Sequence, residues 1–343
     1  MYTVPPKKMI IINILNILKK YSDMDHRLSQ QDIVEKLKKD YYMDVDRKTV
    51  KSNLMALLDL NCGIDYDEIS RTTKQDDKVK DTSLCTGWYI QPEFDDSELR
   101  LLIDSLLFSK NIPHTQCKQL IDKLVGLSNI YFNKKVNHIC NLPENRPENK
   151  ELFYTIDVLD DAISQNKKVA FIYNVYGADK KLHPRREEEY IVSPYQMVAT
   201  NGRYYLICNS DKHDNLSNYR IDLITNIRIL DDMRKPIKDL SEDMNLPKHM
   251  AEHIYMFNGK SIRAKFKAQQ NIIGQVIDWF GNDVKFTKIS DEEYMAEVTV
   301  NENAFYFWAI QYGEYVEVIE PVEIRKKIAE AITAMKEKYT IEE

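Results

Sequence analysis

The feature that most constrains the fold is a hairpin signal in the middle of the chain. Asn201-Gly202 is the dipeptide that two-residue β-turns prefer, because both residues adopt positive φ angles readily. Strand-like runs flank it at 195–199 and 203–209, and aromatic and cationic side chains alternate around it. The pattern predicts the edge of a small β-barrel that presents tyrosines and arginines together. Such a surface can stack a ring or base and neutralise a phosphate.

Three short motifs around this hairpin resemble the signature of the WYL-domain family. They are Ser193-Pro194-Tyr195, Gly202-Arg203-Tyr204-Tyr205-Leu206 and Tyr219-Arg220-Ile221-Asp222, and Tyr204-Tyr205-Leu206 stands where the family usually has Trp-Tyr-Leu. WYL domains are ligand-sensing modules that are most often joined to a DNA-binding winged helix. The resemblance therefore implies a basic ligand-binding patch at these motifs, and it leads us to expect a winged helix elsewhere in the chain.

The N-terminal residues have the pattern of a winged helix. Ser29 followed by Asp32 is a capping-box-like helix start, and Asp46 is the expected cap of the next helix. Three short helices followed by a β-hairpin is the winged-helix order. We therefore assign residues 1–92 to a winged helix-turn-helix DNA-binding domain. The expected elements are helices over 6–21, from Ser29 onward and over 47–60, then strands over 64–69 and 87–91 around a polar stretch at 70–86.

Cationic and amide side chains crowd the first half of the third helix. The N-terminal residues of a recognition helix meet base edges, and Arg and Asn carry the donors that guanine and adenine edges require. The alternative is an ordinary solvated face, which mixed charge usually means. In the expected wing, lysine and arginine side chains alternate with Asp76, Asp77 and Asp81. The acidic residues partly cancel the basic ones, so the wing could contact phosphate or simply be solvated. The predicted DNA-binding residues are Arg47, Lys48, Lys51, Ser52, Asn53, Arg71 and Lys74.

The distribution of charge along the chain limits where DNA contact can occur, and the use of cysteine indicates the compartment. The formal net charge of −6 argues against a uniformly basic nucleic-acid coat. Residues 1–60 hold eleven Lys and Arg against eight Asp and Glu, whereas residues 291–343 hold five against thirteen, so DNA contact belongs at the N-terminal end.

The five cysteines are dispersed without C-x-x-C spacing, which favours reduced thiols. We expect a cytoplasmic, nucleoid-associated protein, with no membrane partner, cofactor or metal.

The remaining residues are predicted to form a linker, a barrel and an α+β domain. From residue 262 the elements alternate as β-α-β-β-α-β, the split βαβ arrangement, which resembles the extension that commonly follows WYL domains. The expected fold class is α+β multidomain. Its expected parts after the winged helix are a helical linker region at 93–165, a small SH3/Sm-like WYL β-barrel at 166–235, and a connector with a C-terminal ferredoxin-like extension at 236–343.

The predicted effector site lies on the central hairpin and a later strand. Arg203 and Tyr205 share a face because they are two residues apart in a strand. Arg220 either pairs with Asp222 as part of the fold, with the tyrosines as structural aromatics, or it clamps an anion beside an aromatic platform. The family resemblance favours the second interpretation. The predicted effector-binding residues are Tyr195, Arg203, Tyr205, Lys212, His213 and Arg220.

The predicted function is a bacterial-type transcriptional regulator that binds double-stranded DNA as a homodimer. A nucleic-acid or anionic small-molecule effector at the WYL domain would change operator affinity allosterically, without catalysis. One alternative is an accessory protein of a defence or DNA-damage system that responds to single-stranded nucleic acid. Another is a zinc hydrolase, because His249-Met250-Ala251-Glu252-His253 matches H-x-x-E-H, with His249 and His253 as ligands and Glu252 as base. Three fixed positions often match by chance, so we do not expect an enzyme.

Overall fold

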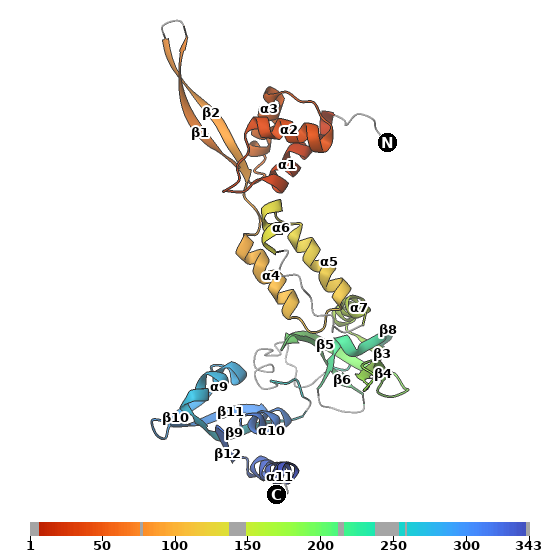
Figure 1. Ribbon diagram of the computed structural model, residues 1–343. Helices are drawn as coiled ribbons and strands as arrows, with labels where there is room; N and C mark the ends of the chain where they lie inside the picture. The colour runs from red at the N-terminus through yellow and green to blue at the C-terminus, as the bar shows by residue number, and fades with distance from the viewer. Residues whose placement is uncertain are drawn as a thin grey trace. The chain divides into compact units, whose positions relative to one another are not determined.

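The computed structural model describes residues 7–75, 78–136, 149–211, 216–236, 254–257 and 259–340. For residues 70–83 it describes no side chain. The chain divides into two compact units, Met1–Glu148 and Asn149–Glu343 (Figure 1). Both units mix helices and sheets, so the architecture is α+β and multidomain. In the described residues, no helix is both long and apolar enough to cross a bilayer.

The first unit begins with three helices and a β-hairpin, which we call the helix–hairpin body. Ser29 and Asp32 form the expected capping box, and Asp46 caps the third helix by accepting a hydrogen bond from the backbone of Thr49. Both caps were predicted from the sequence. The elements are η1 (Lys7–Met9), α1 (Ile10–Tyr21), α2 (Gln30–Tyr41), α3 (Arg47–Asp59), β1 (Ile64–Gln75) and β2 (Lys78–Ile90).

An apolar core joins the three helices to the base of the hairpin. Ile14, Ile33 and Leu54 contribute fully buried side chains from the three helices, and Trp88 contributes one from β2. The backbone of Trp88 exchanges two 2.8 Å hydrogen bonds with Leu28, so the chain before α2 adds a short bridge to the hairpin. The hairpin base is therefore part of the body.

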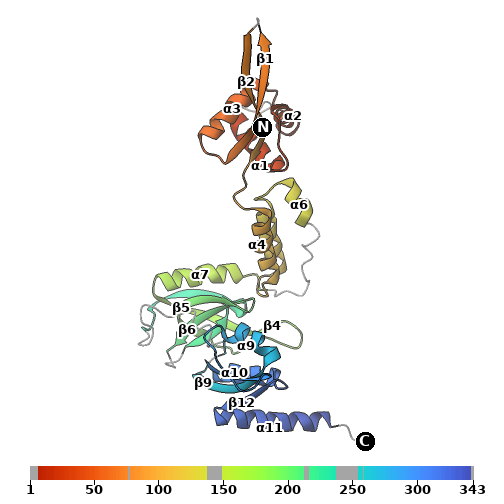
Figure 2. The same cartoon turned by 90° about the vertical axis from the view of Figure 1, so that its left-hand side faces the viewer.

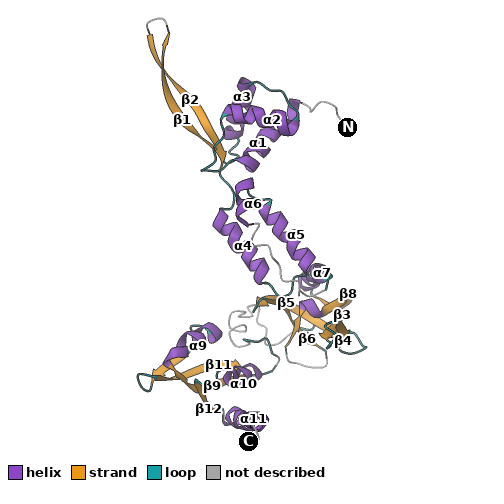
Figure 3. Ribbon diagram, in the orientation of Figure 1, coloured by secondary structure: helices purple, strands orange, loops and turns teal. Residues whose placement is uncertain are grey.

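The hairpin is longer than the sequence predicts (Figure 3). The polar stretch at 70–86 was expected between two short strands, but β1 and β2 span 12 and 13 residues and include most of it. A two-stranded ribbon has no apolar face to bury, so hydrophobic alternation is absent from it. The residues Ser70, Arg71, Thr72 and Thr73 pair with Ser83, Thr82, Asp81 and Lys80 of the opposite strand.

The rest of the first unit is a small helical group. It consists of α4 (Asp96–Phe108), α5 (His114–Val125) and α6 (Ile130–Val136). Asp95 and Glu98 form a capping box that begins α4. A separate apolar core holds these helices together, with Leu99, Ile103 and Ile121 buried in it.

The second unit begins with α7 (Leu152–Ser164) and a curled antiparallel sheet. The sheet order is β4-β3-β5-β6-β7, with β8 paired to β3. Tyr173 of β3 meets Tyr219 of β7 at 4.9 Å between ring centroids, although β5 and β6 lie between these strands in the sheet order. This contact shows how strongly the sheet curls. The strands are β3 (Lys167–Tyr176), β4 (Leu182–Pro184), β5 (Tyr190–Thr200), β6 (Arg203–Ser210), β7 (Ser217–Arg220) and β8 (Ile224–Met233), with η2 (Ile221–Leu223) before β8.

A four-stranded antiparallel sheet with helices forms the end of the chain (Figure 2). Its order is β10-β11-β9-β12, and the β-α-β-β-α-β succession is the one predicted over these residues. Phe266, Phe305 and Trp308 are buried in its core. The elements are β9 (Ser261–Gln269), η3 (Gln270–Ile272), α9 (Ile273–Phe280), β10 (Lys285–Lys288), β11 (Glu293–Asn301), α10 (Glu302–Gln311), β12 (Val316–Glu320) and α11 (Val322–Tyr339).

Candidate nucleic-acid interface and effector site

The start of α3 presents a row of exposed polar side chains. Arg47, Lys48, Lys51 and Ser52 are exposed, as a recognition helix requires. Arg47 also donates from Nε to Oε1 of Gln31 at 2.7 Å, which ties the beginning of α3 to α2. Lys48 and Lys51 therefore offer solvent-exposed charges, whereas the Arg47 side chain is held in place by Gln31.

Asn53 is less available than the sequence suggests. It is half-buried, and its Nδ2 donates to the backbone oxygen of Thr49 at 2.8 Å. That bond uses an amide donor that adenine readout would need. Arg71 and Lys74 lie in β1, but their side chains are outside the part of the chain that the structure describes.

A glycine bulge bends the hairpin at its root, which we define as Asp65–Asp67 facing Thr86–Tyr89. Asp65 pairs with Tyr89 and Asp67 with Thr86, so Tyr66 alone faces two residues of β2. Gly87 has φ +61°, the left-handed geometry that a bulge of this kind reserves for glycine. A Cβ on Gly87 would lie 2.4 Å from Oδ2 of Asp67. The carboxylate of Asp67 therefore fills the space that the glycine leaves.

Arg27 binds the hairpin root from the loop before α2. Its guanidinium pairs with Asp67 and lies 4.7 Å from the ring centroid of Tyr89. The hydroxyl of Tyr89 donates to Asp65 at 3.0 Å, and this hydrogen bond raises the pKa of Tyr89 above its usual value. These contacts fix the direction in which the hairpin leaves the body.

In the curled sheet, Arg203, Tyr205 and Arg220 gather around one buried carboxylate. Tyr205 and Arg220 face each other across β6 and β7. Arg220 donates from Nε and Nη2 to Asp222 at 3.1 and 2.6 Å, and Nη1 of Arg203 lies 3.6 Å from the same carboxylate. The Asp222 side chain is 0% exposed, whereas the two arginines remain partly exposed. Two cations therefore share one anion, and the group keeps a positive charge.

The two arginines differ in what they can bind. Burial alone would lower the pKa of Arg220, but its hydrogen bonds to Asp222 and the charge attraction of that carboxylate, with smaller contributions from nearby tyrosines, together leave its pKa raised. Both of those donors are already engaged with Asp222. Arg203 is held at a longer distance, so its guanidinium is the freer anion-binding group. Burial raises the pKa of Tyr205, which keeps its hydroxyl a neutral donor beside them.

Tyr195, which is also predicted to belong to the effector site, makes its contacts elsewhere in the sheet. Its hydroxyl donates to the backbone oxygen of Lys235 at 2.6 Å, and its ring lies 5.5 Å from the guanidinium of Arg234. Val198 is the β5 residue opposite Tyr205, and Tyr195 precedes it by three residues, about 10 Å along a strand. An irregularity between Pro194 and Gln196 also interrupts the strand register at Tyr195, which the sequence pattern does not show.

Several predicted residues fall outside the part of the chain that the structure describes. Lys212 and His213 of the expected effector site are among them, as are His249, Glu252 and His253 of the H-x-x-E-H match. Among the described residues, no group of three or more His, Cys, Asp or Glu side chains is placed to hold a metal ion.

Sequence reasoning missed a cluster of rings inside the curled sheet. Phe171, Tyr173, Tyr190 and Tyr219 pack at centroid distances of 4.9–5.9 Å, and Arg186 lies 3.7 Å above Tyr190. Burial is the main reason that the pKa of Tyr219 is raised, to about 12. The rings come from three strands, so no single sequence motif predicts the cluster. The signal available was an aromatic residue on each of those strands.

A short segment, 254–257, also reaches the sheet face that carries Tyr205. Met256 is buried with Val198 and Ile207, and Tyr205 packs against this group. Asn201 donates from Nδ2 to the backbone oxygen of Ile254 at 2.6 Å. Tyr255, by contrast, contacts Trp279 of the C-terminal sheet domain at 5.0 Å. The segment therefore links the face with the two arginines to the C-terminal domain.

Comparisons with known proteins identify two domains in the second unit. Residues 154–229 match the model of the WYL domain, and residues 260–336 match that of the WCX domain. A comparison with curated proteins gave no match.

Solved structures give distant similarities along the whole chain. Proteasome accessory factor B/C (PafBC) of Arthrobacter aurescens is 12% identical, with 98% of this chain and 50% of that chain covered and a TM-score of 0.29. A protein described as CRISPR Cas-related is 12% identical, with 97% and 86% covered and a TM-score of 0.40. This chain spans half the length of the first of these structures.

Proposed function

We propose that this chain, a WYL-domain protein that also carries a WCX domain, is a transcriptional regulator that binds duplex DNA and responds to a nucleic-acid or anionic effector. In this proposal the helix–hairpin body is a winged helix with α3 as its recognition helix. The WYL sheet is an SH3/Sm-like barrel that senses the effector, and the C-terminal domain is ferredoxin-like. No step in the proposal requires catalysis.

The observation that carries the DNA-binding part is the exposed row at the start of α3. Lys48, Lys51 and Ser52 lie on the second helix of a helix-turn-helix order, followed by a hairpin whose root is fixed by Gly87 and Arg27. Cations on such a helix reach phosphates, and they supply affinity without sequence preference. Arg47, held by Gln31, has the donors for reading a guanine edge.

A direct test uses the DNA upstream of the gene for this chain, because regulators often control neighbouring genes. We expect footprinting to find a protected site there, and the double variant Lys48→Ala/Lys51→Ala to weaken binding with a smaller dependence on salt. Lys118→Ala/Lys123→Ala on α5 removes the same charge from another exposed helix and serves as the control. Equal loss in both double variants would mean that α3 has no special role.

We further propose that the regulator is a homodimer. One helix–hairpin body offers a small DNA interface, and two half-sites supply the affinity that operators need. Light scattering of the full chain should give twice the mass of the single chain without DNA, and twice that mass plus the mass of the DNA in the complex. A monomer in both conditions would contradict this part of the proposal.

A second candidate function is favoured by the group around Asp222. Arg203 is partly exposed on the same strand face as Tyr205, and an arginine that shares a face with an aromatic residue suits single-stranded nucleic acid. The protein would then respond to single strands in a defence or DNA-damage system. Salt-sensitive binding of oligothymidylate that is lost in Arg203→Ala would support it, and oligothymidylate binding unaffected by this change would argue against it.

A further inference from the structure

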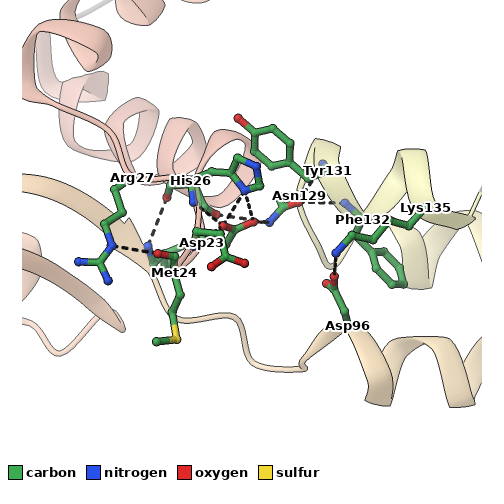
Figure 4. A network of polar contacts seen from close by, with 12 residues as sticks. Asp23, Met24, His26, Arg27, Asp96, Asn129, Tyr131, Phe132 and Lys135 are labelled. Atoms are coloured by element: carbon green, nitrogen blue, oxygen red, sulfur yellow. Dashed lines mark hydrogen bonds and ion pairs between the residues drawn. The ribbon is translucent and has the colours of Figure 1, made fainter.

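The loop between α1 and α2, residues 22–29, is the place where the helix–hairpin body meets α6. Figure 4 shows Asp23, His26 and Arg27 of this loop beside Asn129 and Tyr131. The helix–hairpin body and the group α4–α6 have separate apolar cores. Their relative orientation therefore depends on the contacts made at this joint, where polar groups predominate.

Asn129 acts on both sides of the joint. Its Oδ1 accepts hydrogen bonds from the backbone nitrogens of Tyr131 at 2.9 Å and Phe132 at 3.1 Å, which caps the start of α6. Its Nδ2 donates to Oδ2 of Asp23 at 2.8 Å. Asn129 is 7% exposed, so both bonds are sheltered from water. One amide thus begins a helix and holds the neighbouring loop.

Asp23 organises the loop on the other side. Its Oδ1 accepts from the backbone nitrogens of Asp25 at 2.9 Å and His26 at 2.7 Å, and His26 Nδ1 lies 2.8 Å away. The ring of His26 in turn stacks on Tyr131 of α6, with centroids 3.5 Å apart and an interplanar angle of 9°. The loop is therefore attached to α6 by a hydrogen bond and by a ring stack.

The same loop reaches the hairpin root through its next residues. Arg27 donates from Nε to the backbone oxygen of Met24 at 2.9 Å and pairs with Asp67. Leu28 then bridges to Trp88. A continuous series of contacts runs from Asn129 through Asp23 to Arg27 and the hairpin. A displacement of α6 cannot leave the hairpin root unaffected unless one of these contacts breaks.

We propose that Asp23 and Asn129 are positioning residues that fix the helix–hairpin body on α6 and pass movements of α4–α6 to the DNA-contacting surface. Neither residue touches DNA in this scheme, and both act through the direction of the hairpin and α3. The coupling part of this proposal rests on the proposed DNA-binding function. The positioning part can be measured without DNA.

The sharpest variant is Asn129→Asp in the full chain. Aspartate still caps α6 through one oxygen, but it places a second carboxylate against Asp23 where a donor stood. The exchanged pair Asp23→Asn/Asn129→Asp restores one donor and one acceptor. Gln119→Glu adds the same charge on the exposed surface of α5 and serves as the control. Melting temperatures confirm that all four proteins are folded before comparison.

The first measurement is the distance distribution between spin labels on encoded keto amino acids at Lys48 and Lys118. We expect a narrow distribution in the parent and in Gln119→Glu, a broadened or shifted one in Asn129→Asp, and a narrow one again in the exchanged pair. A parental distribution in Asn129→Asp would overturn the positioning role. This result does not depend on whether the protein binds DNA.

The second measurement is affinity for the upstream DNA with and without oligothymidylate as the effector probe. The effect of the probe is the ratio of DNA affinities measured with and without it. We expect Asn129→Asp to keep its DNA affinity without the probe, but to reduce this ratio by a factor of about two to thirty. The exchanged pair should restore the ratio of the parent. A parental response in a variant with a broadened distribution would overturn the coupling. If the parent binds no DNA, the proposed function fails, while the distance measurement still decides the positioning role.

Discussion

Arg220 holds the buried carboxylate of Asp222 through two hydrogen bonds, from Nε at 3.1 Å and from Nη2 at 2.6 Å. The pair is two residues apart, at the point where β7 ends and η2 begins. A carboxylate with 0% exposure needs such a partner, because an unpaired buried charge is strongly unfavourable. The interpretation of Arg220 as part of the fold thus has a direct structural basis, and the freer Arg203 becomes the main anion-binding candidate.

Arg220→Ala should therefore lower stability. It leaves Asp222 with only the more distant Arg203, and breaking a buried pair from one side costs about 3 kcal/mol. Arg228→Ala breaks the solvent-exposed pair with Glu189, which water screens, and should therefore lower stability much less than Arg220→Ala. Urea unfolding of both variants gives the comparison. A parental midpoint for Arg220→Ala would mean that Asp222 does not need it.

Arg203→Ala should separate ligand binding from stability. Arg203 lies 3.6 Å from Asp222 and keeps 29% of its side chain exposed, so its loss should change the midpoint far less than the loss of Arg220. Binding of oligothymidylate should nevertheless weaken, by more than in Arg228→Ala. Isothermal titration and unfolding on the same preparations test both parts. Loss of stability with unchanged binding would reverse the roles assigned to the two arginines.

Gly87→Ala should destabilise the root of the hairpin. The left-handed backbone at φ +61° disfavours a side chain by about 1–2 kcal/mol, and the new Cβ would collide with Asp67. We expect a lower thermal midpoint, measured through Trp88. Gly274→Ala, where nothing lies within 4 Å of the added Cβ, is the control. A midpoint equal to the parent's would show that the bulge tolerates a side chain.

Asn201 allows the turn and the link to the C-terminal domain to be tested separately. Asn201→Gly keeps the positive φ of 52° accessible but removes the hydrogen bond to Ile254, whereas Asn201→Ala disturbs both. We expect the glycine variant to lose about 1 kcal/mol and the alanine variant to lose more. Calorimetry of the full chain measures both. An alanine variant as stable as the glycine variant would contradict the turn argument.

Asp23 gives the joint a dependence on pH. Burial would raise the pKa of this carboxyl, but its hydrogen bonds to His26 and Asp25 outweigh that and lower it below the usual 3.8. The folded protein therefore favours the charged form, so the stabilisation is fully present above 3.8 and is lost as pH falls through the lower folded value. The difference in melting temperature between the parent and Asp23→Asn should shrink in that acid range. A constant difference would exclude this linkage.

Local signals predicted much of the fold. The caps at Ser29 and Asp46 were predictable because a side chain bonds to a backbone only three residues away. The turn at Asn201-Gly202 was predictable because positive φ angles demand particular residues. The extent of β1 and β2 was not, because a ribbon without an apolar face leaves no alternation to read.

The sites needed information that a sequence pattern does not contain. That Arg203 and Tyr205 share a face follows from strand alternation, but the buried state of Asp222 depends on how the whole sheet curls. Tyr195 makes different contacts from this group, because it lies three residues along β5 from Val198, the partner of Tyr205, at an irregularity in the strand register. The joint at Asn129 was missed because its partners are more than a hundred residues apart in the chain.

The distribution of tryptophan provides natural optical reporters. The chain has three tryptophans, Trp88, Trp279 and Trp308, and none falls within the WYL domain at 154–229. Trp88 is fully buried in the helix–hairpin body, so its emission follows that body. Trp279 contacts Tyr255, next to the Met256 that packs near Tyr205. If the WYL domain binds the proposed effector, selective excitation of tryptophan would detect that binding only through changes outside the WYL domain, and it would do so without added dyes.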